Sequence, residues 1–425
     1  MFNSVSSCWT RFFTATALLF VLNVLMPFCA NAQDITFVEP DSTLTKNSHP
    51  EEDLGAYIRR IRHKPVDTTK TDKTKVAILP SFGYNPSLGA ILGAKVSGVK
   101  QLGDPKNTHL SAFGLEFLLT SKKVISVQAR HNIFKDANKW NFQGNWQFSK
   151  FLVADYGIGT GNNYITKGDS VFPTRFNYIR LMEGAYRRIA KDLYAGVGIA
   201  FNVRTKIDDE RLETLSSTPH QRYSERHGFN PTKYSSNGLL VGFQYDTRDH
   251  PLRSYSGAHV EIVLRYNPEW LGSSKNSTQF YYDIRKYIGL SKRNPAHVLA
   301  LWSFASFKLN GAIPYLELAA TGADLYNRSG RAYTISRFKG PSFAYGEAEY
   351  RFPITPNKLL SGVAFMNVQT ASDDLGKKIF EYWEPGVGAG LRILLQKNSR
   401  TVICVDYAMG KHDSSGIFFG LNEAF

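Results

Sequence analysis

Polar and apolar residues alternate along much of this chain with a period of two. Between residues 140 and 149 one face is aromatic apart from a glycine, and the other face is wholly polar. The first face holds Trp140, Phe142, Gly144, Trp146 and Phe148, and the second holds Asn141, Gln143, Asn145, Gln147 and Ser149. Residues 125–133 and 258–266 follow the same pattern. Such alternation predicts β-strands with different surroundings on their two faces.

The contrast between faces is strongest in the stretch from Ser336 to Thr355. Glu347, Glu349 and Arg351 share one predicted face with Tyr345, whereas the other face is small or aromatic. A strand buried in a protein core does not line its second face with two glutamates and an arginine. A strand of a membrane barrel does, because lipid lies outside it and a wet lumen lies inside.

A basic tip precedes this strand and contains Arg337, Lys339 and Gly340. We expect the tip to fold back into the lumen and to set its cations against Glu347 and Glu349. A surface loop with solvated charges is the alternative.

The whole pattern predicts an all-β fold, a transmembrane antiparallel β-barrel of about sixteen strands. An even number is usual for bacterial single-chain barrels. A soluble β-sandwich would also alternate, but its strands would be shorter and less aromatic at their ends. The predicted strands are 84–100, 109–120, 123–135, 139–151, 153–164, 172–189, 192–206, 236–247, 256–267, 276–290, 296–308, 343–353, 359–371, 384–396, 399–410 and 415–425.

The connections between these strands should alternate between short periplasmic turns and longer extracellular loops. The predicted periplasmic set includes 121–122, 190–191, 291–295, 354–358 and 396–398, and the long loops are 207–235, 309–342 and 372–383. The stretch 84–100 could be divided, which would shift the count.

The first 32 residues read as a signal peptide. Arg11 precedes an apolar run, and Ala30 and Ala32 give a small-x-small cleavage pattern, so cleavage is expected after Ala32. A membrane-anchoring helix is the alternative. Residues 33–75 are polar and predicted to be a flexible periplasmic lead-in with one short helix near 51–62, and residues 76–425 form the predicted barrel.

The composition limits which classes of binding partner are expected. The net charge is +15 and aromatic residues make up 13%, while the mean hydropathy is only −0.27. Since the chain is exported, acidic lipid phosphates or acidic clients are expected in place of nucleic acid.

Cys404 is the only cysteine beyond the leader, so no disulfide is expected within the mature chain. No cofactor, metal or catalytic site is predicted, because no spacing of ligands or nucleophiles supports one.

Three motifs together resemble the barrel of the BamA/TamA family, also called the bacterial surface antigen family. The first contains Asp246, Arg248 and Asp249, followed by Gly257, at a predicted periplasmic hairpin. The second is the tip and strand between 336 and 355. The third combines residues 386–392, 406–408 and 422–425. The resemblance covers residues 76–425 and is best after residue 236.

In that family, an arginine-glycine-aromatic tip on the sixth extracellular loop enters the lumen and pairs with acidic residues on the next two strands. The resemblance places the tip at Lys339-Gly340-Pro341, with Arg337 nearby, and the acidic positions at Glu349 and Asn367. Lysine cannot make the planar two-pronged contact of arginine, so a looser lock is implied.

The last residues, with Phe419, Leu421 and Phe425, resemble the sorting signal read by the barrel-assembly machinery, although Glu423 departs from its apolar pattern. The resemblance implies a non-enzymatic barrel in the cell outer membrane of a Gram-negative bacterium, which inserts or translocates proteins. Its implied partners are outer-membrane lipids and lipopolysaccharide, client outer-membrane or secreted proteins, and separate periplasmic proteins. The stretch 33–75 is too short for a POTRA module, which leaves a passive solute pore or receptor as the alternative.

Overall fold

The chain is described here from a computed structural model, which covers residues 51–63, 75–85, 89–160, 171–212, 216–324 and 328–425. Sixteen strands form one antiparallel sheet in chain order, and two further short strands pair separately. The helices in these ranges are too short and too polar to cross a membrane. The leader and most of the lead-in predicted from the sequence lie outside the described residues.

The strands of the large sheet run from β1 to β18 without a crossover. They are β1 (Lys75–Asn85), β2 (Gly89–Lys100), β3 (Ser111–Thr120), β4 (Ile125–Lys135), β5 (Trp140–Asp155), β6 (Phe172–Ala190), β7 (Leu193–Asp209), β8 (Lys233–Asp246), β9 (Gly257–Asn267), β10 (Ser277–Gly289), β11 (Val298–Gly311), β14 (Ser342–Pro353), β15 (Leu360–Ala371), β16 (Glu384–Gln396), β17 (Thr401–Gly410) and β18 (Ser415–Leu421). The remaining elements are the helices α2 (Leu54–Ile61) and α3 (Pro219–His227), the 3-10 turns η4 (Glu269–Leu271) and η5 (Tyr315–Glu317), and the small ladder of β12 (Ala319–Ala320) with β13 (Lys339–Gly340).

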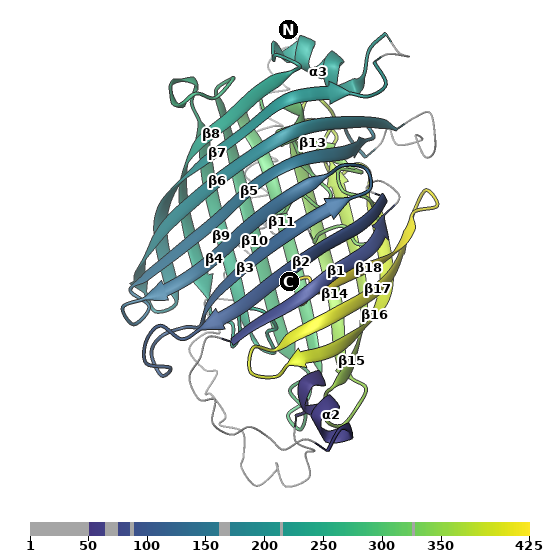
Figure 1. Cartoon of the computed structure of the whole chain (residues 1–425). Helices are drawn as coiled ribbons and strands as arrows, with labels where there is room; N and C mark the ends of the chain where they lie inside the picture. The colour runs from purple at the N-terminus through teal and green to yellow at the C-terminus, as the bar shows by residue number, and fades with distance from the viewer. Residues whose placement is uncertain (1–50, 64–74, 86–88, 161–170, 213–215, 325–327) are drawn as a thin grey trace. The chain divides into compact units, whose positions relative to one another are not determined.

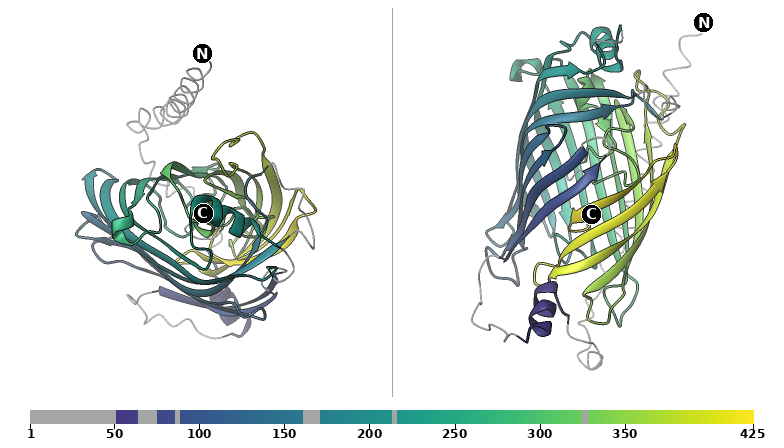
Figure 2. Two further views of the ribbon diagram at one scale, coloured as in Figure 1. Left: turned by 90° about the horizontal axis from the view of Figure 1, so that it is seen from above. Right: turned by 45° about the vertical axis from the view of Figure 1, so that its right-hand side comes forward.

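The sheet curls into a nearly closed barrel, as Figures 1 and 2 show. Its order begins at β1 and ends at β18, and within the described residues no ladder joins these two strands. The predicted barrel of about sixteen strands is therefore confirmed, with a seam between its first and last strands. Near this seam Asn422 Nδ2 donates to Ser97 Oγ on β2 at 3.1 Å.

The two ends of the barrel differ in their connections. The end that carries α3 also carries the long connections 156–171, 210–232, 312–341 and 372–383, and we refer to it as the loop end. The opposite end carries α2, which confirms the short helix predicted in the lead-in, together with the connections 136–139, 191–192 and 397–400. We refer to it as the turn end.

Two errors in the predicted strands cancel in the count but change the orientation of the first strands. The predicted strand 84–100 corresponds to β2 alone, and β1, which lies almost wholly before it, was not predicted. The predicted strands 139–151 and 153–164 both overlap the single strand β5, which ends at Asp155. As a result, the turn at 121–122 was assigned to the wrong end. It lies at the loop end, where Arg175 Nη1 donates to Lys122 O at 3.0 Å.

The physical reason lies in the turn residues. Pro86 and Ser87 between β1 and β2 are turn formers. In contrast, Phe151, Leu152 and Val153, where the predicted strands were divided, include no residue that favours a turn, so β5 continues through them to Asp155.

The predicted alternation of faces is confirmed. On β5, Asn141 and Asn145 are buried, whereas Trp146 and Phe148 are exposed on the outer wall. On β14, Glu347 and Glu349 are buried inside while Tyr350 is exposed. An outer wall that is apolar around the barrel, with a charged interior, is the pattern of a barrel whose outer face meets lipid.

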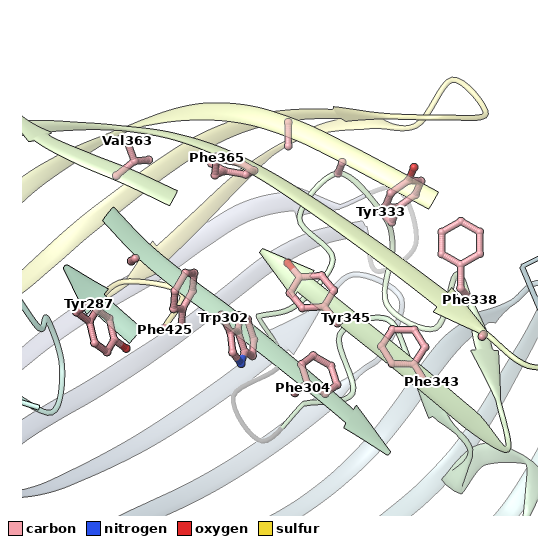
Figure 3. Close-up of a cluster of buried hydrophobic side chains, with 14 of the residues drawn as sticks. Tyr287, Trp302, Phe304, Tyr333, Phe338, Phe343, Tyr345, Val363, Phe365 and Phe425 are labelled. Atoms are coloured by element: carbon pink, nitrogen blue, oxygen red, sulfur yellow. The ribbon is translucent and has the colours of Figure 1, made fainter. Parts of the chain in front are cut away.

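The interior next to β10, β11, β14 and β15 is filled by aromatic side chains (Figure 3). Tyr333 and Phe338 reach this cluster from the 312–341 loop, and Phe425 reaches it from the last residues of the chain. The rings of Trp302 and Phe425 lie 5.2 Å apart. The wall, one loop and the C-terminal segment therefore share one core inside the barrel.

The corrected orientation predicts two distances. Spin labels at Lys123 and Glu210, which line one cavity at the loop end, should lie close together. Labels at Asp136 and Glu210 should be far apart, because β5, with 16 residues, spans on the order of 50 Å at about 3.3 Å per residue. Double electron–electron resonance measures both pairs. A distance between Asp136 and Glu210 that is shorter than the one between Lys123 and Glu210 would contradict this orientation and support the one predicted from the sequence.

Candidate functional site

The connection from 312 to 341 is the sixth at the loop end, and we refer to it as L6. Its two arms are joined by the β12–β13 ladder, which pairs Ala319 with Gly340 and Ala320 with Lys339. α3 holds its first residues, since Tyr223 Oη donates to Ile313 O at 2.8 Å. The segment around Arg331 is buried inside the barrel, so the prediction that this loop enters the lumen is confirmed.

Arg331 is the cation that meets the glutamates of β14. Its Nη2 contacts Glu347 and lies 2.6 Å from Glu349 Oε2, and its Nη1 lies 2.9 Å from Asp406 Oδ2 on β17. The guanidinium also stacks 3.5 Å from the centre of the Phe365 ring. One L6 side chain is thus held by three carboxylates from two separate wall strands.

Further ion pairs extend this cluster along the wall. Arg351 Nε lies 2.7 Å from Glu349 Oε1. Arg392 contacts Asp406 and lies 2.6 Å from Glu423 Oε2. Charge-assisted, multidentate contacts of this kind are stronger than neutral hydrogen bonds. The network is completed by Arg253, whose Nε lies 3.1 Å from Glu423 Oε1.

We refer to these eight side chains as the lumen network. Its members are Arg253, Arg331, Arg351, Arg392, Glu347, Glu349, Asp406 and Glu423. Four arginines face four carboxylates, so the network is balanced in charge, and each side chain is at most 7% exposed. Buried charges are tolerated only when they are paired in this way.

The predicted loop-tip cations do not pair with the predicted glutamates. Lys339 Nζ lies 2.7 Å from Asp155 Oδ1 at the loop end of β5, far from β14 in sequence. Arg337 stacks 4.3 Å from the centre of the Tyr156 ring. Gly340 packs tightly, because a Cβ at this position would lie 2.5 Å from Ser372 O. The pairing expected for Arg337 and Lys339 is therefore wrong, although all three residues fix L6.

Asn367 lies where the resemblance placed an acidic residue, and it does contact L6. Its Nδ2 donates to Arg331 O at 2.9 Å. An amide suits this role because it binds a carbonyl, whereas a carboxylate would repel it.

Sequence reasoning missed Arg331, although a signal was present. Arg331-Ala332-Tyr333 keeps the arginine and the aromatic residue of the family's tip, with alanine in place of glycine. Ala332 adopts φ 98, a conformation that favours glycine. Because Lys339-Gly340-Pro341 contains a glycine, the family's tip was predicted at that tripeptide, which is wrong.

Residues 422–425 leave the wall and enter the barrel. Asn422 has φ 68, which turns the chain after β18. Glu423 then joins the lumen network, and Arg328 of L6 donates to Glu423 O and, at 2.9 Å, to Leu421 O. Of the predicted sorting residues, Phe419 is exposed on the outer wall, whereas Leu421 and Phe425 are buried.

The hairpin motif between β8 and β9 forms one compact turn. Asp246 accepts from Arg248 Nε at 2.9 Å and Nη2 at 2.6 Å. Asp249 accepts from two backbone N–H groups and pairs with Arg400, in the turn 397–400, at 2.5 Å. Gly257 has φ 98, and a Cβ there would lie 2.1 Å from Thr247 O, so only glycine fits.

His250 lies in the same turn, outside the strands. Burial, with Arg400 nearby, lowers the pKa of His250 to about 3. Its Nδ1 accepts from the backbone N–H groups of Leu252 and Arg253 at 3.2 and 3.3 Å. The neutral ring therefore orients Arg253 toward the lumen network.

A cavity of about 150 Å³ lies in the barrel interior on the β2–β5 and β8–β10 side. Lys95, Glu116, Glu261 and Arg328 line it, together with residues 422–425. Within the described ranges no cluster of His, Cys, Asp or Glu is arranged to hold a metal ion. The cavity is thus lined by charged side chains of both signs.

The sequence of this chain matches a known protein family. The model of the Omp85 superfamily domain matches residues 192–425, more than half of the chain. The chain belongs to the Omp85 superfamily. A search of curated protein sequences finds no significant match.

Solved structures show the same Omp85 fold at low identity. BamA from Haemophilus ducreyi lacking POTRA domains 1-3 has a TM-score of 0.52 at 13% identity, with 83% of this chain and 70% of that chain covered. CdiB from Acinetobacter baumannii has a TM-score of 0.50 at 10% identity, covering 82% and 59%. CdiB from Escherichia coli has a TM-score of 0.52 at 9% identity, covering 82% and 62%. This chain spans 59 to 70% of those proteins, and the likeness concerns the fold alone.

The lumen network predicts how L6 responds to loss of its central cation. In Arg331→Ala, three carboxylates lose a shared partner, which should cost about 3–5 kcal/mol. L6 should then leave the lumen, and trypsin should cleave after Arg337 and Lys339, which are buried in the parent. Limited proteolysis followed by mass spectrometry measures this.

Arg331→Lys is the matched control. It keeps the charge but loses the planar fork, so cleavage should be intermediate. An unchanged tryptic pattern in a folded Arg331→Ala barrel would contradict the role of Arg331.

Proposed function

We propose that this Omp85 barrel inserts or translocates proteins at the outer membrane of a Gram-negative bacterium, without chemical catalysis. We place the loop end on the extracellular side of the membrane and the turn end on the periplasmic side. The observation that carries the proposal is the seam, where the sheet begins at β1 and ends at β18 with no ladder between them in the described residues.

Unpaired strand edges are templates for another strand. β18 has 7 residues, whereas β1 has 11, and the chain turns inward after Leu421. The two edges are therefore unequal in length. β18 is too short to cover the whole unpaired edge of β1. A client strand can pair there through its backbone, so recognition requires little of its side-chain sequence.

The filled lumen favours this route over passage through the centre. L6 and residues 422–425 occupy the interior, and the lumen network fixes both to the wall. A passive solute pore needs a continuous water path, whereas here L6 and residues 422–425 lie inside the barrel, bound to its wall. A client handled at the seam needs no such path.

Cross-linking the seam tests the proposal. Ile78 on β1 and Phe419 on β18 are both exposed on the outer wall, at 69% and 64%. Cysteines at these positions, joined by a flexible bis-maleimide, should hold the seam shut. We expect the cell to lose insertion or secretion of its client proteins, measured by quantitative outer-membrane proteomics, while the barrel itself still shows heat-modifiable gel mobility.

The matched control joins two strands that are already paired. Tyr407 and Ile417 are cross-strand neighbours of β17 and β18, so the same reagent there leaves the seam free and should leave the proteome unchanged. If the Ile78–Phe419 cross-link is also harmless, opening of the seam is not the mechanism. If depletion of the chain removes the uptake of one solute and leaves membrane proteins unchanged, the pore or receptor alternative replaces the proposal.

A further inference from the structure

Helix α2 at the turn end is strongly two-sided. Leu54, Tyr57, Ile58 and Ile61 recur at the spacing that places side chains on one face of a helix. No residue of the helix is buried, and Ile58 and Ile61 are 40% and 59% exposed. An apolar stripe on a short helix is normally covered, so within the described residues the outer part of this stripe, Ile58 and Ile61, lacks its occupant.

The beginning of this segment is hydrogen-bonded to the barrel. Glu52 N donates to Asn357 O at 3.0 Å, and Asn357 Nδ2 donates to Glu52 Oε2 at 2.8 Å, in the turn between β14 and β15. Asp53 caps the helix through Ala56 N at 2.8 Å and accepts from Lys397 N at 3.3 Å. Two turns therefore hold the first turn of α2, and the last turn projects from the barrel (Figures 1 and 2).

The acidic and basic residues of this segment lie at its opposite ends. The acidic residues Glu51, Glu52 and Asp53 lie at the attached start, and the cations Arg59, Arg60 and Arg62 lie at the projecting end. At 100° per residue, Arg60 and Arg62 flank the apolar stripe on its two sides. Arg60 Nη2 lies 3.1 Å from Glu52 Oε2, yet its side chain remains 64% exposed. Long arginine stems in these positions can reach phosphates while the stripe enters an apolar layer.

The outer wall above α2 is apolar as far as this end of the barrel. Leu391 on β16 is exposed, and so is Ile354 in the turn that holds Glu52. The stripe of α2 is therefore attached to the rim of a wall that faces lipid in an Omp85 barrel. A helix with an apolar face bordered by arginines at such a rim matches a segment that lies in the lipid headgroup layer.

We propose that α2 is an interfacial helix that binds anionic phospholipids of the leaflet at the turn end. Ile58 and Ile61 enter the boundary between headgroups and acyl chains, and Arg60 and Arg62 bind lipid phosphates. Because the start of α2 contacts two turns, this binding fixes the height of the β14–β17 rim in the bilayer. The inference requires a membrane barrel but does not depend on client handling at the seam.

Spin-label accessibility tests the proposal in the full-length barrel in proteoliposomes. Ile61→Cys reports the apolar stripe and Arg59→Cys, on the opposite face, is the matched control. A sample without an added cysteine gives the labelling background, since Cys404 is buried. In vesicles of phosphatidylethanolamine and phosphatidylglycerol, we expect the Ile61 label to collide more often with oxygen than with a water-soluble nickel chelate, and the Arg59 label to show the reverse.

Removing either the anionic lipid or the two arginines should shift the Ile61 label toward water. Vesicles of phosphatidylcholine alone should reduce its oxygen preference, and so should Arg60→Gln combined with Arg62→Gln in anionic vesicles. Heat-modifiable mobility of each variant shows that its barrel is folded. An Ile61 label that is as accessible to nickel as the Arg59 label in anionic vesicles would overturn the proposal, and a periplasmic protein would then be the candidate occupant of the stripe.

Discussion

The architecture depends on the pairing of charges that the barrel has removed from bulk water. A single buried guanidinium or carboxylate would cost several kcal/mol, and that cost is offset only when every charge has a partner. The lumen network meets this condition with four arginines and four carboxylates. Because Arg331 belongs to L6 and Glu423 follows β18, neither segment can leave the lumen without stranding charges on the wall.

The same network gives the barrel a strong side and a weak side. β14, β16 and β17 are joined to one another from within by Arg331 and Arg392, in addition to their backbone ladders. β18 contributes a short ladder of 7 residues, and at the seam no ladder forms in the described residues. The barrel is therefore braced inside and unjoined at one edge, which is the edge where we propose that client strands pair.

Sequence patterns were most informative where one local rule decides the structure. The alternation in β14 correctly placed Glu347 and Glu349 inside, because the period of a strand leaves no other choice. Gly257 sits at a positive φ with no room for a Cβ, so its motif marks a real turn. The helix α2 was predicted from its local pattern as well.

Patterns failed where the outcome depends on contacts between distant residues. Lys339 pairs with Asp155, which lies 184 positions away in the sequence, and no local signal links the two. Arg331 was missed because Ala332 replaces the glycine of the family's tip and only the fold shows that this backbone adopts a positive φ. The inward turn of residues 422–425 also depends on Arg392, Arg253 and Arg328, which come from three different parts of the chain.

The most direct measurement is a double-mutant cycle between Arg331→Ala and Glu349→Ala, with the free energy of unfolding followed in urea and detergent. If Arg331 fixes L6 through Glu349, the two losses will be non-additive, with a coupling free energy of about 0.5–3 kcal/mol. The pair Lys339→Ala and Glu349→Ala should be additive, because Lys339 binds Asp155 instead. Additivity of Arg331 and Glu349 to within about 0.5 kcal/mol would contradict the account.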